Sequence, residues 1–170
     1  IKDRIAQTGY LGGTPQISAI LAAAGLNPNQ AVTYFTNALD TTTRGVDLVG
    51  DYRQSIGAYG NLRYTLGFNW NTTQIDDIHA SSVAQQALGP TGGYDRQRQG
   101  NLKYGLPQSK LLLGTTWTYE KLELGLNLTR YGEYTQYGTA EAFDRTFSPA
   151  WITDLNIDYH LTPAITLNAG

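Results

Sequence analysis

The chain has 170 residues and a formal net charge of −2, with 19 Gly, 12 Tyr, 3 Trp and neither Cys nor Met. The slight negative charge and the lack of a basic stripe argue against a nucleic-acid partner. The absence of Cys excludes disulfide frameworks and thiolate metal sites. Its longest apolar run, residues 19–24, is far shorter than the roughly 20 residues of a membrane helix. Any membrane-spanning structure in this sequence would therefore be a β-barrel.

The N-terminal part of the chain predicts the end of a strand at residues 1–5 and a long loop over residues 7–30. A short helix is expected inside this loop. Thr14 is assigned as its N-cap, Pro15 as its first helical residue and Gly25 as its terminator. A helix of this size is expected to fill the loop, with a partner-binding helix as the alternative.

Five complete strands follow, and each is recognised by apolar and polar side chains that alternate along the chain. The strands cover residues 46–53, 61–71, 111–119, 122–129 and 151–159, and a further strand begins at residues 165–170. In the clearest of them one face carries Leu62, Tyr64, Leu66, Phe68 and Trp70, and the other carries Arg63, Thr65, Gly67, Asn69 and Asn71.

The connections between these strands alternate strictly between short and long. Tight turns are predicted at residues 55–60, 119–122 and 161–164, and long loops at residues 7–30, 77–108 and 138–149. All long loops therefore emerge at one end of the sheet. Outer-membrane barrels have this asymmetry, with short turns on the periplasmic side and long loops outside.

Aromatic side chains lie at both ends of the apolar face, which distinguishes two readings of the alternation. In a soluble sandwich the apolar face is a core, whereas in a membrane barrel it meets lipid and ends in aromatic girdles. The four residues near the tight turns are Tyr52, Trp117, Tyr119 and Tyr159, and the two near the long loops are Trp70 and Trp151. This placement favours the barrel. About seven strands would leave two open edges in hydrocarbon, so the chain is expected to be a fragment of a larger closed barrel.

Three segments resemble TonB-dependent outer-membrane receptors. These are Ile1-Lys2-Asp3-Arg4-Ile5, the segment Thr42-Thr43-Arg44-Gly45-Val46-Asp47-Leu48, and the hairpin over residues 151–170. The resemblance implies an all-β, antiparallel transmembrane barrel, of which residues 1–170 would be the C-terminal portion with about seven of 22 strands. It also implies a plug domain outside this sequence, a location in the bacterial outer membrane, and contacts with lipid, the remaining strands and TonB. A scarce ligand such as a ferric siderophore, haem or cobalamin would be imported. A passive porin and a soluble all-β binding module or adhesin remain as alternatives.

No enzyme motif is found: the sequence has no nucleophile elbow, phosphate loop or zinc spacing. We therefore expect neither catalysis nor a cofactor. His79 follows Asp76 and Asp77, and this cluster is either a metal site or, as the more common case, a solvated group of side chains on a loop.

Ligand binding is the better use of the loops, where arginines are interleaved with aromatic residues. Arg supplies bidentate donors and Tyr supplies stacking area, which suits an anionic, partly aromatic ligand. Packing within the loops is the alternative role. The candidate ligand-binding residues are Tyr94, Arg96, Arg98, Tyr134, Tyr137, Phe143 and Arg145. On the polar face, Asp47, Asp51, Arg53 and Arg63 are expected to face the lumen and form ion pairs between strands or to the plug.

Overall fold

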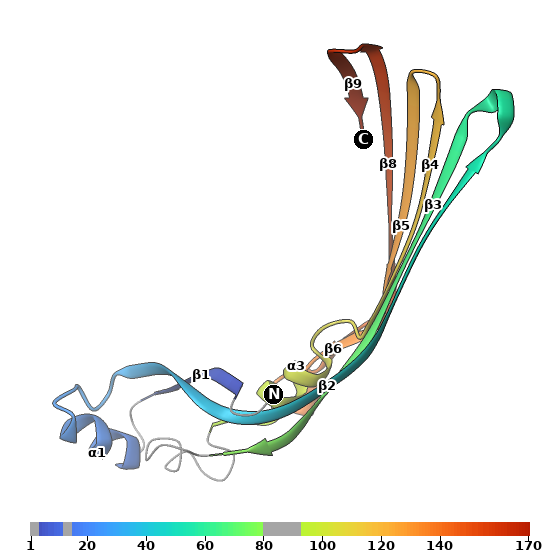
Figure 1. The fold of residues 1–170 in the computed structure, drawn as a ribbon. Helices are drawn as coiled ribbons and strands as arrows, with labels where there is room; N and C mark the ends of the chain where they lie inside the picture. Colours follow the sequence, from blue (N-terminus) through green and yellow to red (C-terminus); the bar gives the residue numbers. More distant parts are fainter. Residues whose placement is uncertain (1–3, 12–14, 80–92) are drawn as a thin grey trace. The chain divides into compact units, whose positions relative to one another are not determined.

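The computed structural model describes residues 4–11, 15–79 and 93–170, and seven strands in it form one sheet (Figure 1). Neighbours in the sheet follow one another along the chain, in the order β1-β2-β3-β4-β5-β8-β9. The short strands β6 (Tyr134–Gln136) and β7 (Arg145–Phe147) form a separate two-stranded sheet. The seven strands are β1 (Arg4–Leu11), β2 (Ala31–Ser55), β3 (Asn61–Ile78), β4 (Ser109–Tyr119), β5 (Leu122–Tyr131), β8 (Ala150–Thr162) and β9 (Ile165–Ala169).

The helices of the described residues are short. They are α1 (Pro15–Ala23), α3 (Arg96–Tyr104) and the 3-10 helices η1 (Gly57–Tyr59) and η2 (Glu141–Phe143). Within the described ranges, no helix has both the length and the apolar character to cross a membrane.

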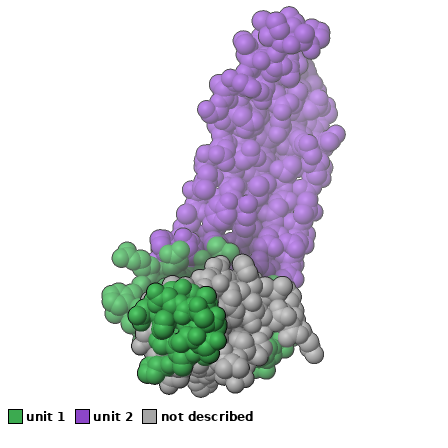
Figure 2. Space-filling model, turned by 90° about the vertical axis from the view of Figure 1, so that its left-hand side faces the viewer, with its two compact units in different colours: residues 1–44, 72–106, 135–145 green, residues 45–71, 107–134, 146–170 purple. Residues whose placement is uncertain are grey.

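The chain divides into two compact units, which are drawn in different colours in Figure 2. Unit 1 consists of residues 1–44, 72–106 and 135–145. Unit 2 consists of residues 45–71, 107–134 and 146–170. Unit 2 holds the five complete strands that the sequence predicts, and unit 1 holds α1, α3 and most of the long connections.

The three tight turns of unit 2 are where the sequence predicts them. They join β2 to β3, β4 to β5, and β8 to β9, and they lie at the same end of these strands in Figure 1. The first turn contains η1 and ends at Gly60, whose φ is 92°. A Cβ on Gly60 would lie 2.1 Å from the carbonyl oxygen of Thr118, so only Gly fits here.

Strand register in unit 2 confirms the predicted apolar face. Leu66 lies opposite Leu113, and Leu126 lies opposite Thr115 on one side and Leu155 on the other. Among the described residues no second sheet covers this face, and Leu113, Leu126 and Leu155 are 37%, 40% and 56% exposed. An exposed apolar face of this kind is what a wall that faces lipid requires.

The opposite, polar face of unit 2 is packed closely around glycines. A Cβ on Gly114 would lie 2.2 Å from Thr65 Oγ1, and one on Gly125 would lie 2.4 Å from Asn156 Nδ2. The side chains of Thr65 and Asn156 therefore occupy the space that a side chain at these glycines would fill. This explains why Gly recurs on the polar side of the alternating pattern.

Several strands extend further than the sequence predicts. The first strand is β1 (Arg4–Leu11), not a segment that ends near residue 5, and β3 continues to Ile78. Long before the predicted start at residue 46, β2 begins at Ala31. The sequence of these extensions lacks a sustained alternation of apolar and polar residues, so the pattern that identifies a strand is lost. Thr42 Oγ1 donates to Asp76 Oδ2 at 2.6 Å and pairs the two extensions.

The predicted helix in the first long loop is α1 (Pro15–Ala23), and it ends as expected at Gly25. The φ of Gly25 is 72°, and its N–H donates to Ala22 O at 3.0 Å. Leu26 N–H donates to Leu21 O at 2.9 Å, which completes a Schellman cap. Burial of Ile17 and Leu21 agrees with a loop-filling role. Thr14, the predicted N-cap, lies outside the described residues.

Candidate functional site

Six of the seven candidate ligand-binding residues lie in unit 1, which also contains α3, a helix that the sequence analysis did not predict. Asp95 is its N-cap, and its Oδ1 accepts a hydrogen bond from Arg98 N–H at 2.9 Å. The helix is polar on nearly every side and contains Gly100, so it lacks the apolar periodicity by which a helix is recognised. An Asp cap nine residues before the terminal Tyr104 and Gly105 was the signal that could have revealed it.

Arg96 joins α3 to the loop between β6 and β7. Its Nη1 donates to Asp144 Oδ1 at 2.8 Å, and its Nη2 donates to Asp144 Oδ2 at 2.5 Å. Asp144 Oδ1 also accepts from Gly138 N–H at 2.9 Å. The hydrogen bonds from Arg96 and the Gly138 amide lower the pKa of Asp144 from 3.8 to about 2. The same pair raises the pKa of Arg96, so both groups are ionised throughout the physiological range.

The ring of Tyr137 fills the space above Gly100. A Cβ at Gly100 would lie 2.2 Å from Tyr137 Cγ, which is shorter than any real carbon contact. Arg96 Cζ lies 4.9 Å from the centre of this ring, within range of a cation–π interaction. Tyr104 stacks on it with the ring centres 6.0 Å apart. Gly100 is therefore required so that the aromatic ring can dock against the helix.

Asn101 completes the junction by pairing with the backbone of Tyr137. Its Oδ1 accepts from Tyr137 N–H at 2.7 Å, and its Nδ2 donates to Tyr137 O at 3.3 Å. The side-chain amide thus replaces a strand neighbour for this residue. Together with the Arg96–Asp144 ion pair, these contacts define what we call the loop clamp: Arg96, Gly100, Asn101, Tyr137 and Asp144.

Two of the candidate ligand-binding residues have internal contacts. The Tyr94 side chain is only 5% exposed and forms a core with Leu39, against which Ile75, Ile78 and Leu102 pack. Arg98 Nη1 donates to Gly93 O at 2.9 Å, and its Cζ lies 5.9 Å from the centre of the Tyr94 ring. Tyr94 therefore packs within the loops, which is the alternative role, and Arg98 lies beside it.

The remaining candidates differ in exposure. Phe143 is 67% exposed and lies against Gly138, while Arg145 is exposed and has no ion pair within the residues that the structure describes. Tyr134 belongs to unit 2 and stacks on Phe147, with the ring centres 4.7 Å apart. The structure therefore brings Arg96, Tyr137 and Phe143 together in unit 1, and Tyr134 is not part of that group.

On the polar face of unit 2, three of the four residues predicted to face the lumen form one ion-pair cluster. Arg63 Nε lies 2.6 Å from Asp51 Oδ2 on the neighbouring strand, and Arg53 Nε lies 3.7 Å from Asp51 Oδ1. Asp47 departs from the expected ion pairing, because its Oδ1 accepts a hydrogen bond from Asn69 Nδ2 at 2.6 Å. A cross-strand amide therefore takes the place of a cation.

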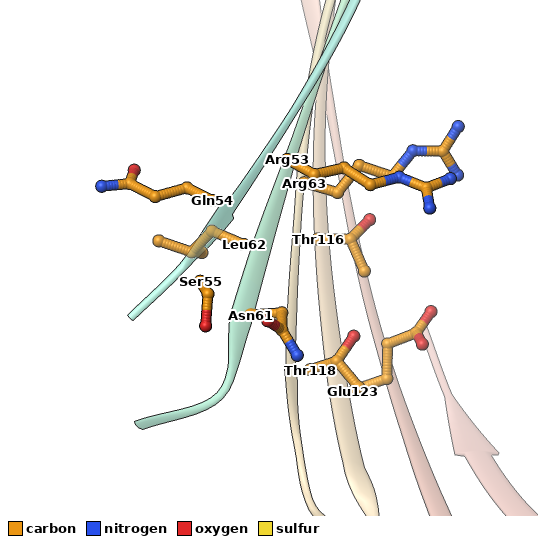
Figure 3. Close-up of a pocket in the computed structure, with 9 residues that line it drawn as sticks. All are labelled: Arg53, Gln54, Ser55, Asn61, Leu62, Arg63, Thr116, Thr118 and Glu123. Atoms are coloured by element: carbon orange, nitrogen blue, oxygen red, sulfur yellow. The ribbon is translucent and has the colours of Figure 1, made fainter. Parts of the chain in front are cut away.

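A hollow of about 610 Å³ adjoins this cluster near the tight turns (Figure 3). In Figure 3 the side chains of Arg53 and Arg63 extend together on one side of the sheet, and Leu62 points to the other side. The lining of the hollow also includes Thr116, Thr118 and Glu123. The hollow is thus polar and carries charges of both signs.

His79 bridges two carboxylates in unit 1. Its Nε2 lies 3.2 Å from Asp40 Oδ1, and its Nδ1 lies 3.2 Å from Asp77 Oδ2. The third residue of the predicted cluster, Asp76, bonds instead to Thr42. Over the described ranges, no group of His and carboxylate side chains has the arrangement of a metal site. The cluster joins the extensions of β2 and β3.

Comparison with known proteins supplies the context for this arrangement. The family model described as TonB dependent receptor-like, beta-barrel matches residues 1–170. A search of curated proteins finds no match.

Proposed function

The chain belongs to the β-barrel family of TonB-dependent receptors, and we propose that its long loops capture the ligand that the receptor imports. Receptors of this family lie in the bacterial outer membrane and drive ligand uptake with energy received through TonB. They are transporters, not enzymes. Membership decides against the passive porin and the soluble binding module, the two alternatives that the sequence left open.

We place residues 1–170 in the C-terminal portion of the barrel. The apolar face of unit 2 would meet lipid, and the polar face would line the lumen. The Asp51, Arg53 and Arg63 cluster and the adjoining hollow would then face the plug domain. A surface with charges of both signs suits a partner that docks through polar contacts and is later displaced.

The loop clamp is the observation that carries the capture proposal. The bidentate Arg96–Asp144 pair and the Tyr137–Gly100 contact hold α3 and the loop over residues 137–144 together before any ligand arrives. Ordering loops in advance lowers the entropic cost of binding. Phe143 and Arg145 lie beside the clamp and are exposed, so we assign ligand contact to them and a supporting role to Arg96 and Tyr137.

The chemistry of these residues favours an anionic metal chelate such as a ferric siderophore. Arg145 would contact the ligand's negative charge and Phe143 its aromatic or apolar parts. Haem, which also combines carboxylates with a flat aromatic ring, and cobalamin are the other ligands to be tested.

The experiment measures binding and uptake in receptor-deficient cells that express the intact receptor. Radiolabelled ferric catecholate, ferric hydroxamate, haem and cobalamin are offered separately, with and without an uncoupler. We expect one chelate to bind in both conditions and to enter only energised cells. Phe143→Ala with Arg145→Ala should weaken its binding by roughly 5–150-fold, the scale of one or two charge-assisted contacts.

A matched control, Tyr59→Ala with Lys121→Ala, removes one aromatic ring and one cation from two of the tight turns. It should leave surface binding unchanged. Equal binding by the loop variant and the wild type would show that the capture surface lies elsewhere. Uptake that survives the uncoupler would contradict energy-coupled import by this receptor.

A further inference from the structure

Arg130 is a charged residue on the otherwise apolar face of unit 2. The register places it directly opposite Leu111 on β4 and Trp151 on β8, and both of these belong to the apolar face. Next to it on the same face of β5 comes Leu128. No charged residue occupies the other positions of this face in β3, β4, β5 and β8. These positions run from Leu62 to Trp70, from Ser109 to Tyr119, from Leu122 to Leu128 and from Trp151 to Tyr159. Within these four described strands, Arg130 is therefore the one cation on that face.

No side chain on the described residues neutralises Arg130. It has no ion pair or hydrogen bond there, and it is half-buried among its apolar neighbours. Arg63, on the polar face, is paired with Asp51 at 2.6 Å. A half-buried guanidinium without an anion is unfavourable, because its hydrogen-bond donors lose water and gain nothing in return. The arrangement leaves Arg130 in need of an external anion.

The depth of Arg130 can be derived from the strand geometry. The centre of the apolar face lies at Leu126 and Leu155, midway between Trp151 and Tyr159. Four residue steps from Leu126 to Arg130 are about 13 Å along a strand at ~3.3 Å per residue. With a tilt of ~40° this is roughly 10 Å from the midplane, just inside the edge of the ~25 Å apolar band. A long side chain at this depth reaches the headgroup layer.

The tight turns assign this edge to one leaflet. Arg130 is close to the end of β5 that leads into a long connection, and the tight turn after Tyr119 is at the other end. Long connections of outer-membrane barrels lie outside the cell. Trp151 beside it is 54% exposed, as is usual for an aromatic residue at the boundary of the membrane. Arg130 therefore lies at the headgroups of the outer leaflet.

We propose that Arg130, with Trp151 beside it, is a binding site for the phosphate group of an outer-leaflet lipid. The planar guanidinium donates two parallel hydrogen bonds to phosphate oxygens, a geometry that Lys cannot reproduce. The indole and Leu128 contact the upper part of the acyl chains. A lipid bound in this way satisfies the cation that the protein leaves unpaired and fixes the height of the barrel wall in the bilayer.

The test is native mass spectrometry of the intact receptor, titrated with phosphatidic acid in detergent. Phosphatidylcholine, whose positively charged choline group balances the charge of the phosphate, is the comparison lipid. We expect wild-type receptor to retain phosphatidic acid, and Arg130→Gln to weaken this by about tenfold or more. Arg130→Lys should fall between the two, because it keeps the charge and loses the bidentate geometry. Arg63→Gln, which removes a cation from the polar face, is the matched control and should bind as the wild type does.

Two results would overturn the proposal. The first is equal retention of phosphatidic acid by the wild type and Arg130→Gln, because Arg130 would then extend into water without binding lipid. The second is displacement of phosphatidic acid by inorganic phosphate at equal concentration, because the site would then recognise the free anion. If Arg130→Gln does not fold, which a heat-dependent gel shift detects, the Arg130→Lys comparison decides between the same outcomes.

Discussion

The sequence leaves two roles open for Arg96, ligand capture and packing within the loops, and the structure shows the second. Arginine beside tyrosine on a loop suggests anion capture, and the pattern in this region supports that hypothesis. In the structure the guanidinium is already occupied by Asp144 and lies over Tyr137. The positive charge of Arg96 is therefore neutralised within the loops, by Asp144. Arg145 has no such partner among the described residues, and it is the arginine to which we assign ligand contact in our proposal.

The ionisation of Asp144 gives the loop clamp a defined pH dependence. Its pKa is lowered from 3.8 to about 2 in the clamped structure. When the loops separate, the carboxyl regains its ordinary pKa and binds protons more readily. The stabilisation is therefore fully present above pH ~4 and decreases as the pH falls through about 2. We expect no change in the clamp between pH 8 and pH 5, since neither state titrates there.

Hydrogen exchange of the Gly138 amide, which donates to Asp144, measures this dependence in the intact receptor. After correction for intrinsic rates, protection should be constant above pH ~4 and should decline towards pH 2. In Asp144→Asn the amide should exchange faster at neutral pH and show no such decline. Protection that decreases already between pH 8 and pH 5 would assign the clamp to a different titrating group.

At the scale of elements, Gly100 connects helix chemistry to loop packing. Alanine is the better helix former by about 1 kcal/mol, so Gly100→Ala should stabilise α3 if the helix stood alone. Its Cβ would instead lie 2.2 Å from Tyr137 Cγ. We expect the variant to separate the loop over residues 137–144 from α3 and to raise the exchange rate of the Tyr137 amide, which donates to Asn101.

Gln97→Ala is the control, because it changes the same helix without entering the space of Tyr137. It should leave the exchange of the Tyr137 amide unchanged. If the Tyr137 amide is as well protected in Gly100→Ala as in the wild type, the ring can pack elsewhere and its contact with Gly100 is not required for docking.

The elements also differ in how far sequence alone can define them. Strands that face lipid on one side and polar surroundings on the other carry a period-2 pattern, so β4 and β5 are predicted nearly to the residue. Beyond the membrane edge this contrast disappears, and the start of β2 at Ala31 and the end of β3 at Ile78 were missed. The helix α3 was missed for the same reason, since it is polar on nearly every side.

Loop side chains were harder to assign than strands, because their roles depend on contacts across long sequence separations. Arg96 and Asp144 are 48 residues apart, and nothing local to either one indicates the other. Burial of Tyr94 follows from its packing with Leu39, which is equally remote. By contrast, the pairing of Asp51 with Arg63 was predictable, because a tight turn places their strands side by side.

At the scale of the whole molecule, the central claim is that unit 2 is part of a membrane wall with lipid on its apolar face. Leu126 and Asn127 are neighbours in sequence, have nearly the same depth and point to opposite faces, as the register with Leu155 and Asp154 shows. An arginine at each position therefore introduces the same charge at the same height. Only the surroundings of the two side chains differ.

The most direct measurement is the free energy of unfolding of the intact receptor from lipid bilayers, for the wild type, Leu126→Arg and Asn127→Arg. Near the midplane, an arginine that faces lipid should cost about 2–4 kcal/mol. We predict this loss for Leu126→Arg and a much smaller one for Asn127→Arg, whose side chain enters the polar interior. Equal losses for the two variants, or a larger loss for Asn127→Arg, would contradict the membrane-wall account.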